Sequence, residues 1–365
     1  MKKSLLAVAV AAALPAFAQA QTNVVLSGIF KTGVTYTDYS HGAANNGDHV
    51  ALSDGSSRFI ISGSEDLGGG LKGIFQVDSR FRVDDGSQSI AGGNTFLGLA
   101  GGFGTVRLGK LDTYYYFGTD EHGARATALT HSNISILSYV NGTSNAIARA
   151  SRSQNIVRYD TPNFGGIKGG LSWSPGAATT EGAGMDDGNK GQAWSADIGY
   201  AAGPLALGVA FWDEKNEGYK LAAPGALTGQ QAWRVFGSYN FGMFKLGLTY
   251  DDAKVKFNGG DTKRAAWSIP VTAQLGPGTV LFTYSQAQDT KTNGSKNNDT
   301  GARMFSLGYD YPLSKRTSLG VSYAQVNNEA AAAYGYYTGV ALNNLSAPLA
   351  GQDQKQFYVG LRHAF

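Results

Sequence analysis

The sequence has no cysteine among its 365 residues, and after its N-terminus it has no long apolar run. The absence of cysteine excludes a disulfide framework and any thiolate metal site. A membrane-spanning helix requires about 20 consecutive apolar residues, and the chain offers no such stretch. The five histidines lack the i, i+4 spacing of a helical zinc pair, so we interpret them as solvated loop or strand residues and expect no metal and no cofactor.

An excess of charge of one sign is also absent, because 30 basic residues stand against 27 acidic ones. A nearly neutral chain argues against nucleic acid as a partner, and any electrostatic function must come from local placement of charges. Glycine is abundant instead, with 51 residues against 9 prolines, and tyrosine and phenylalanine number 19 and 18. This composition is typical of many short strands joined by tight turns.

The first twenty residues have the features of a secretory signal peptide. Lys2 and Lys3 precede a short apolar run from Leu5 to Leu14, which is too short to span a bilayer. The segment Ala18-Gln19-Ala20 has the small-x-small pattern of a cleavage site. We therefore expect a signal peptide over residues 1–20, cleavage between Ala20 and Gln21, and one mature domain over residues 21–365.

Behind this segment, apolar and polar residues alternate with a period of two. A representative stretch alternates Phe244, Leu246, Leu248 and Tyr250 with Lys245, Gly247, Thr249 and Asp251. In a membrane barrel with lipid outside and water inside, each strand typically has one polar face and one apolar face with aromatic residues near its ends. A soluble antiparallel sheet gives the same alternation in any single strand, so the number and spacing of the strands must decide.

Sixteen segments show strand character, which lies within the even-numbered range of membrane barrels. We predict an all-β fold, a 16-stranded antiparallel transmembrane β-barrel. The candidate strands are 23–37, 57–64, 70–83, 94–100, 104–111, 151–161, 167–174, 192–201, 204–213, 231–240, 243–255, 265–274, 278–288, 302–311, 317–326 and 354–365.

The connections between these strands alternate between short and long along the chain. Short periplasmic turns and long external loops give this alternation in a membrane barrel. A soluble sandwich has no reason to show it. The expected long links are 38–56, 84–93, 112–150, 175–191, 214–230, 256–264, 289–301 and 327–353.

Successive side chains of a strand point alternately to lipid and to the lumen, and this alternation predicts which charges point into the lumen. An arginine on the lipid face would cost roughly 2–4 kcal/mol at mid-bilayer. The early strands thereby offer a basic wall, and the third and longest link offers an acidic loop. A basic wall that faces an acidic loop sets up a transverse field, and the excess of basic residues predicts a modest anion preference. The alternative for each arginine is a salt bridge that only stabilises the wall. The wall residues are Arg58, Arg80, Arg82, Arg107 and Arg152, and the loop residues are Asp112, Asp120 and Glu121.

Several motifs carry a family resemblance. The most specific is Gly63-Ser64-Glu65-Asp66-Leu67-Gly68 followed by Gly70-Leu71-Lys72, and it is supported by the segments 101–106, 157–162 and 359–365. Together they resemble the Gram-negative trimeric porins of the neisserial and β-proteobacterial type, over essentially the whole chain after residue 20. The resemblance implies a homotrimer, a third loop folded into the lumen, and a terminal Phe365 that serves as the signal for the barrel insertion machinery.

We therefore expect a general diffusion porin that passes small hydrophilic solutes and ions across the outer membrane, surrounded by outer-membrane lipid and lipopolysaccharide. A substrate-selective channel of the same fold is the main alternative. An outer-membrane barrel enzyme would need a Ser/His/acid constellation on neighbouring strands. The only histidine in a candidate strand is His363, in lipid-facing phase, and there is no G-x-S-x-G motif, so we expect no enzymatic activity.

Overall fold

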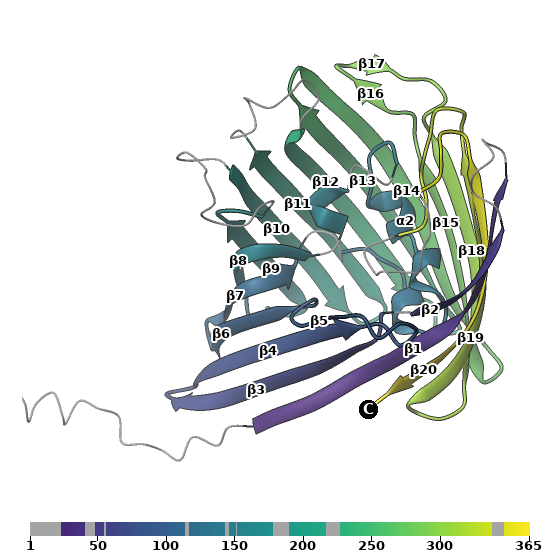
Figure 1. The fold of residues 1–365 in the computed structure, drawn as a ribbon. Helices are drawn as coiled ribbons and strands as arrows, with labels where there is room; N and C mark the ends of the chain where they lie inside the picture. Colours follow the sequence, from purple (N-terminus) through teal and green to yellow (C-terminus); the bar gives the residue numbers. More distant parts are fainter. Residues whose placement is uncertain are drawn as a thin grey trace, which may run out of the picture.

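The protein is a closed antiparallel β-barrel in the computed structural model (Figure 1). The structure describes residues 23–40, 48–54, 56–113, 117–142, 146–150, 152–177, 190–216, 227–337 and 347–365. The expected cleavage site at Ala20 and Gln21 lies outside these residues. No helix in the described ranges is both long enough and apolar enough to cross a bilayer.

Sixteen strands in the described part form the wall, which confirms the predicted strand number and fold class. Four short strands, β2 (His49–Asp54), β5 (Gln88–Ser89), β16 (Lys291–Thr292) and β17 (Ser295–Lys296), belong to the external connections. The wall strands are β1 (Asn23–Ser40), β3 (Arg58–Gly68), β4 (Leu71–Phe81), β6 (Thr95–Gly101), β7 (Gly104–Asp112), β8 (Arg152–Asp160), β9 (Ile167–Ser174), β10 (Lys190–Ala202), β11 (Leu205–Asn216), β12 (Leu227–Asn240), β13 (Phe244–Phe257), β14 (Gly260–Leu275), β15 (Gly278–Ala287), β18 (Ala302–Pro312), β19 (Thr317–Asn328) and β20 (Asp353–Ala364).

The barrel closes where the last strand pairs with the first. β1 pairs with β20 on one side and with β2 and β3 on the other. At the end of this contact Phe365 and Gly28 exchange two backbone hydrogen bonds of 3.1 Å. Closure leaves none of the described wall strands with an unpaired edge toward lipid, where an unsatisfied backbone group has no water to bind. The role of Phe365 as an assembly signal stays a prediction.

The two faces of the wall differ as the alternation predicts. On β13 the side chains of Leu246, Leu248 and Tyr250 are exposed on the outer face, whereas Thr249 and Asp251 are buried inside the barrel. The same pattern of alternating exposure runs along β18, β19 and β20. The wall therefore presents an apolar surface to lipid and reserves its polar side chains for the interior.

One predicted connection is wrong. The expected long link 256–264 is a two-residue turn at Asn258 and Gly259, since Phe257 pairs directly with Gly260. Gly259 has a φ of +105°, a conformation that favours glycine. Beyond Tyr250 the outward positions of β13 become charged, at Asp252, Lys254 and Lys256, whereas the inward Ala253 and Val255 belong to the buried core. The apolar outward pattern therefore ends although the backbone pairing continues.

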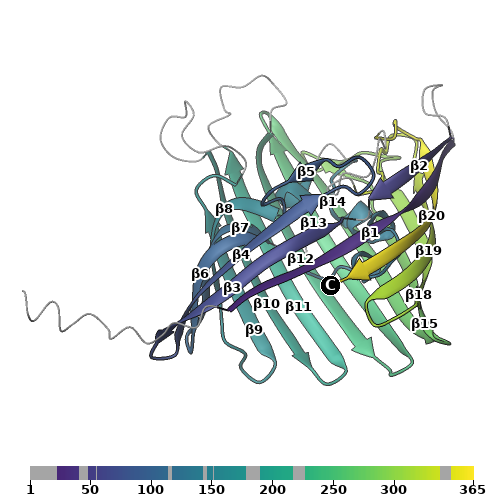
Figure 2. The same cartoon turned by 60° about the horizontal axis from the view of Figure 1, so that its bottom comes forward.

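The third connection, between β7 and β8, turns into the barrel (Figures 1 and 2), as the resemblance implies. Its described part contains three single turns of 3₁₀-helix, η2 (His122–Ala124), η3 (Leu129–His131) and η4 (Ile147–Ala150), and one turn of α-helix, α2 (Ile134–Leu137). The run Tyr114 to Tyr116 lies outside the described residues. We refer to residues 117–142 and 146–150 as the third loop.

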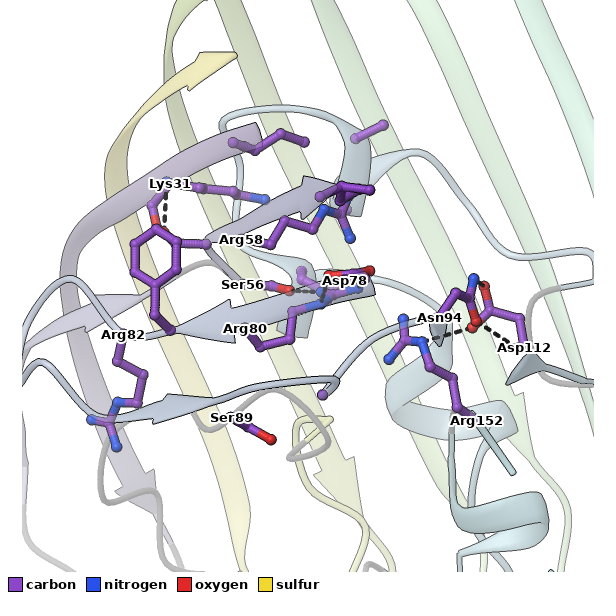
Figure 3. Close-up of a pocket in the computed structure, with 18 of the residues that line it drawn as sticks. Lys31, Ser56, Arg58, Asp78, Arg80, Arg82, Ser89, Asn94, Asp112 and Arg152 are labelled. Atoms are coloured by element: carbon purple, nitrogen blue, oxygen red, sulfur yellow. Dashed lines mark hydrogen bonds and ion pairs between the residues drawn. The ribbon is translucent and has the colours of Figure 1, made fainter. Parts of the chain in front are cut away.

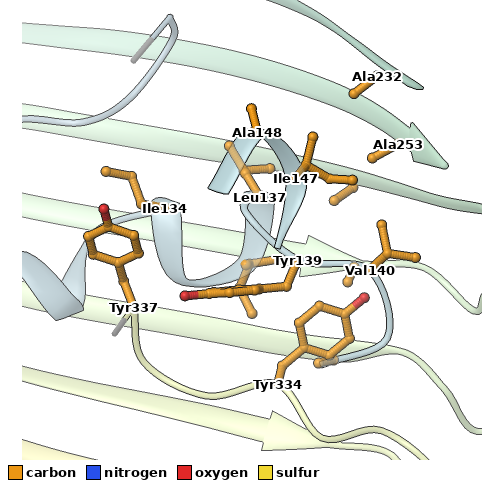
Figure 4. Close-up of a cluster of buried hydrophobic side chains, with 14 of the residues drawn as sticks. Ile134, Leu137, Tyr139, Val140, Ile147, Ala148, Ala232, Ala253, Tyr334 and Tyr337 are labelled. Carbon is orange, nitrogen blue, oxygen red and sulfur yellow. The ribbon is translucent and has the colours of Figure 1, made fainter. Parts of the chain in front are cut away.

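The third loop packs against one half of the wall and forms a dry core inside the barrel (Figure 4). Ile134, Leu137 and Val140 from the loop are buried there with Tyr334 and Tyr337 from the connection between β19 and β20. Eight consecutive wall strands, β10 to β15, β18 and β19, each add one buried alanine, whose small side chain lets the loop approach the wall. These alanines are Ala193, Ala210, Ala232, Ala253, Ala266, Ala287, Ala302 and Ala324.

Two buried arginines fix the loop backbone to this half of the wall. Arg234 and Arg264 share the carboxylate of Asp251, with N–O distances of 2.9 and 2.7 Å. Arg234 also donates to the carbonyl of Phe117 at 2.9 Å. Arg264 donates to the carbonyls of Leu137 and Tyr139 at 2.9 and 3.0 Å, which satisfies the C-terminal end of α2. Asp251, on the polar phase of its strand, is thus fully buried between two arginines.

Two histidines also hold the loop. We expected them to be solvated, but both are fully buried. His122 contacts Ser306 at 3.3 Å, and His131 contacts Ser322 at 2.9 Å and Gln356 at 3.0 Å. Burial lowers the pKa of each imidazole to about 3, so both rings are neutral at physiological pH.

Asp120 fixes the loop next to these rings. It accepts hydrogen bonds from the Thr283 hydroxyl at 2.7 Å and from the Asn133 backbone N–H at 2.9 Å. Burial raises the pKa of its carboxyl group to about 6. Its charge state therefore changes within the same acidic range in which an exposed histidine takes up a proton.

Replacing Arg264 should release part of the third loop without opening the barrel. Arg264→Gln leaves Asp251 and two loop carbonyls short of donors, and breaking such a buried pair costs about 3–5 kcal/mol. We expect unstable single-channel conductance in planar bilayers. Arg303→Gln, on the exposed face of β18, is the matched control. A quiet channel of normal conductance in the Arg264 variant would contradict this role.

Acid should loosen the docking of the third loop. A released loop would restore the pKa of His122 and His131 from about 3 to 6.5, so release takes up two protons below pH 6.5. Asp120 opposes this with one proton, because its pKa falls from about 6 to 3.8 on release. Docking is therefore strongest at neutral pH and weakens through the acidic range, by about 1.4 kcal/mol per pH unit for one net proton.

The measurement is the frequency of voltage-induced closure at about pH 7 and about pH 5, on either side of the ordinary histidine pKa. Closure should be more frequent at the lower pH, and His131→Gln should flatten the dependence because it removes one of the titrating rings. Equal closure at both pH values in the unmodified protein would refute the prediction.

Candidate functional site

The third loop leaves an open cavity of about 750 Å³ on the other half of the barrel. Its wall comes from β1, β3, β4, β7 and β8 and from Asn94, just before β6, and its opposite side is the loop (Figure 3). Six basic residues and three acidic residues line it. The basic ones are Lys31, Arg58, Arg80, Arg82, Lys110 and Arg152, and the acidic ones are Asp78, Asp112 and Asp120.

Arg58 and Arg80 lie directly opposite each other on β3 and β4. Like charges in this position destabilise a sheet unless a counter-charge is close. The counter-charge for Arg80 is Asp78, which contacts the guanidinium of Arg80 at 2.8 Å. Two guanidinium groups therefore remain side by side on the lumen face.

Arg152 and Arg82 each lie next to an acid. Arg152 contacts Asp112 at 2.9 Å, and Asn94 donates to the same carboxylate at 2.6 Å. Asp112 is the last residue of β7 and pairs across the sheet with Arg152, so its predicted place in the acidic loop is wrong. Arg82 contacts Asp84 at 2.9 Å, just after β4 ends.

Arg107 lies on the lumen face but is not among the residues that line the cavity. It is the fourth residue of β7 after the short turn that joins β6 and β7, toward the periplasmic end of the wall. There it contacts Asp160, which also binds Arg158 at 2.8 Å. The alternation along the strand correctly predicts that Arg107 points into the lumen. Its position along the barrel axis, however, separates it from the other four arginines.

The acidic loop face that we expected is not assembled in this structure. Glu121 points toward Lys245 and Arg125, and it is absent from the cavity lining. Asp120 lines the cavity, but its carboxylate is held by Thr283 and by the loop's own backbone. The loop offers the cavity mostly small and apolar side chains, which are Thr119, Gly123, Ala124, Leu129 and Ile134.

Lys31 is a cavity residue that the sequence reasoning missed. Its ammonium group donates to the carbonyl of His122 at 3.3 Å, where the third loop meets β1. The signal was present, because Lys31 belongs to the inward phase of the first strand. Lys110, near the end of β7, was also missed, because an alternation counted from the inward Arg107 places it on the outward face. The pairing of β7 with β8 is irregular between Gly109 and Leu111, and Lys110 lines the cavity.

No three His, Asp or Glu side chains come together as a metal site within the ranges that the structure describes. All six basic residues that line the cavity come from the barrel wall or the connections next to it, and Asp120 is the charged residue that the third loop contributes to the lining.

Comparisons with known proteins agree with this architecture. Residues 7–331 match the family model described as Gram-negative porin. The outer membrane porin protein 32 of Delftia acidovorans is 32% identical, over 100% of this chain and 100% of its own length. The major outer membrane protein P.IB of Neisseria gonorrhoeae is 28% identical, over 88% of this chain and 92% of its own length.

A solved structure has the same barrel. The anion-selective porin from Comamonas acidovorans superposes with a TM-score of 0.77 at 28% identity, covering 94% of this chain and 100% of that one. The match extends over the closed wall of sixteen strands. The chain therefore belongs to the Gram-negative porin family, and it is a β-barrel channel of the outer membrane through which small hydrophilic solutes diffuse.

Proposed function

We propose that the channel prefers small anions to cations, and that the basic wall of the cavity is the cause. The observation that carries the proposal is the balance around the cavity, where six cationic side chains stand against three carboxylates. Arginine remains charged at every physiological pH. An anion that crosses the cavity therefore meets a field of opposite sign along one side of its path.

The wall residues support a preference rather than tight binding. Asp78 and Asp112 each lie within 2.9 Å of an arginine, so part of the positive charge is already balanced. The solved relative from Comamonas acidovorans is described as anion-selective, which favours the same sign of selectivity. A substrate-selective channel would need a set of oriented donors around one solute, and no contact among the cavity residues favours that alternative.

We also propose that the protein has no enzymatic activity. Two histidine–serine pairs exist inside the barrel, His122 with Ser306 and His131 with Ser322. All four side chains are buried between the third loop and the wall, with at most 2% of their surface exposed. A nucleophilic serine must reach its substrate, and these pairs have no access to solvent.

Removing two of the wall charges should reduce the anion preference. For the double variant Arg58→Gln and Arg80→Gln, we expect the chloride-to-potassium permeability ratio to fall several-fold, because a unit charge about 4 Å from an ion contributes about 1 kcal/mol in water. The ratio follows from the reversal potential in a KCl gradient. Arg303→Gln, on the outer face, should leave it unchanged, and a native channel that passes potassium more readily than chloride would disprove the proposal.

We propose that three copies of the chain assemble as a trimer through the wall that contains β6 and β7. A nearly continuous outward belt of aromatic side chains marks the lipid interface on β9 to β20 and on β1. It comprises Trp173, Trp194, Trp233, Tyr250, Trp267, Tyr284, Phe305, Tyr323, Phe357 and Tyr36.

The belt is interrupted on β6 and β7. The outward residues there are aliphatic, with Leu97 68% exposed, Leu99 44% and Leu108 53%. Phe75 of the neighbouring β4 lies opposite Leu97, and on the same side of the barrel the rings of Phe30 on β1 and Phe81 on β4 lie 5.1 Å apart. Aromatic side chains anchor a barrel wall at the level of the lipid headgroups. A wall segment that lacks them is better suited to contact another subunit than to contact lipid.

A bulky residue in this contact should weaken the trimer. Leu97→Trp places a large ring where we expect another subunit to pack, whereas Leu248→Trp places the same ring on the lipid-facing wall of β13. Both variants should fold, because indole is tolerated near lipid. Molecular mass in detergent should fall to that of a monomer only for Leu97→Trp. Intact trimers in both variants, or monomers in the native protein, would reject the contact.

A further inference from the structure

The β13–β14 hairpin extends outward beyond the aromatic belt. Tyr250 and Trp267 face each other across the two strands, and their rings contact Trp233 and Tyr284 with centroids 5.3 Å apart. Such aromatic residues mark the level at which hydrocarbon gives way to headgroups. Side chains that follow on the same face therefore lie at the headgroup level of the outer leaflet or just above it.

Four lysines form a row across this outer face. The sheet register places Lys254 opposite Lys263, Lys263 opposite Lys291, and Lys291 opposite Lys296, so that β13, β14, β16 and β17 contribute one each. Residues directly opposite each other share a face of the sheet. We refer to these four residues as the lysine row.

The lysine row faces outward and not into the lumen. Lys254 and Lys263 lie four residues beyond Tyr250 and Trp267, which an alternation of period two places on the same face. The neighbouring Arg264 points inward and is fully buried. The lysine side chains are accessible, with 49% of Lys263 and 60% of Lys296 exposed.

Three acids contact the row directly, and the charges of Glu329 and Asp299 also act on Lys296. Asp252 contacts Lys263 at 3.0 Å, Asp261 contacts Lys254 at 3.7 Å, and Asp289 contacts Lys296 at 2.9 Å. Lys256 lies on the same outward phase of β13 and adds a fifth positive charge. Directly opposed like charges destabilise a sheet, and four in succession favour an anionic partner that bridges them.

The spacing suits an extended anion held at the membrane surface. Neighbouring strands lie about 4.8 Å apart, so the row spans roughly 14 Å along the membrane plane. Basic clusters next to the hydrocarbon boundary attract anionic headgroups. The aromatic rings below the row supply the apolar contact that acyl chains need. The row also lies away from β6 and β7, where we propose the subunit contact.

We propose that the lysine row binds the phosphate-bearing headgroup of an outer-leaflet glycolipid of the lipopolysaccharide class, whose acyl chains pack on the aromatic belt beneath it. The proposal rests on the outer-membrane location of the barrel and not on the proposed anion preference. The two can therefore fail independently, since one is read from lipid binding and the other from reversal potentials.

The experiment compares the intact purified protein with the double variant Lys263→Gln and Lys291→Gln, which removes the centre of the row. A matched control, Lys315→Gln with Arg316→Gln, removes two exposed charges from the turn between β18 and β19 at the opposite end of the barrel. The probes are bisphosphorylated lipid A, the same lipid without phosphates, and inorganic phosphate. Binding is followed in detergent by native mass spectrometry, and KCl conductance verifies that each variant is folded.

Each lysine near a membrane surface contributes about a fivefold factor in affinity for an anionic headgroup. The double variant should therefore bind bisphosphorylated lipid A roughly 25-fold more weakly, while the control variant binds it as the native protein does. Equal binding by the double variant, equal binding of the dephosphorylated lipid, or displacement of lipid A by inorganic phosphate at similar concentration would each overturn the proposal.

Discussion

A backbone surrounded by lipid has no water to satisfy its N–H and C=O groups, and the fold depends on this constraint. The pairing of β1 with β20, completed by Gly28 and Phe365, satisfies it by turning a sheet into a ring. Once the backbone is satisfied within the wall, the side chains decide only what each face contacts. The outer face can be uniformly apolar, and the inner face is free to carry charge.

A ring of sixteen strands is too wide for its own inward side chains to fill. The third loop and the segment around Tyr334 fill one half with a dry core, seated on a row of alanines and held by Arg234 and Arg264. The other half remains open as the cavity. The dimensions of the passage are therefore set by how the loop docks, and the buried polar groups behind the loop are as important to transport as those that face the solute.

The electrostatics of the passage come from placement and not from composition. The whole chain carries a formal net charge of +3, which by itself predicts nothing about selectivity. Cationic side chains gather on one wall of the cavity, whereas Asp251 and Glu121 are paired elsewhere in the barrel. Outside the barrel, the register of β13, β14, β16 and β17 aligns lysines that are far apart in the sequence.

The sequence by itself determined the strand number, the lipid-facing and lumen-facing phases, and the inward direction of Arg58, Arg80 and Arg152, because alternation is a local property of each strand. Only the tertiary structure decided the height of Arg107, the burial of the third-loop histidines and the β13–β14 turn. Height along the barrel axis depends on the register between strands, and loop burial depends on contacts between residues up to 226 positions apart. No local pattern encodes either of them.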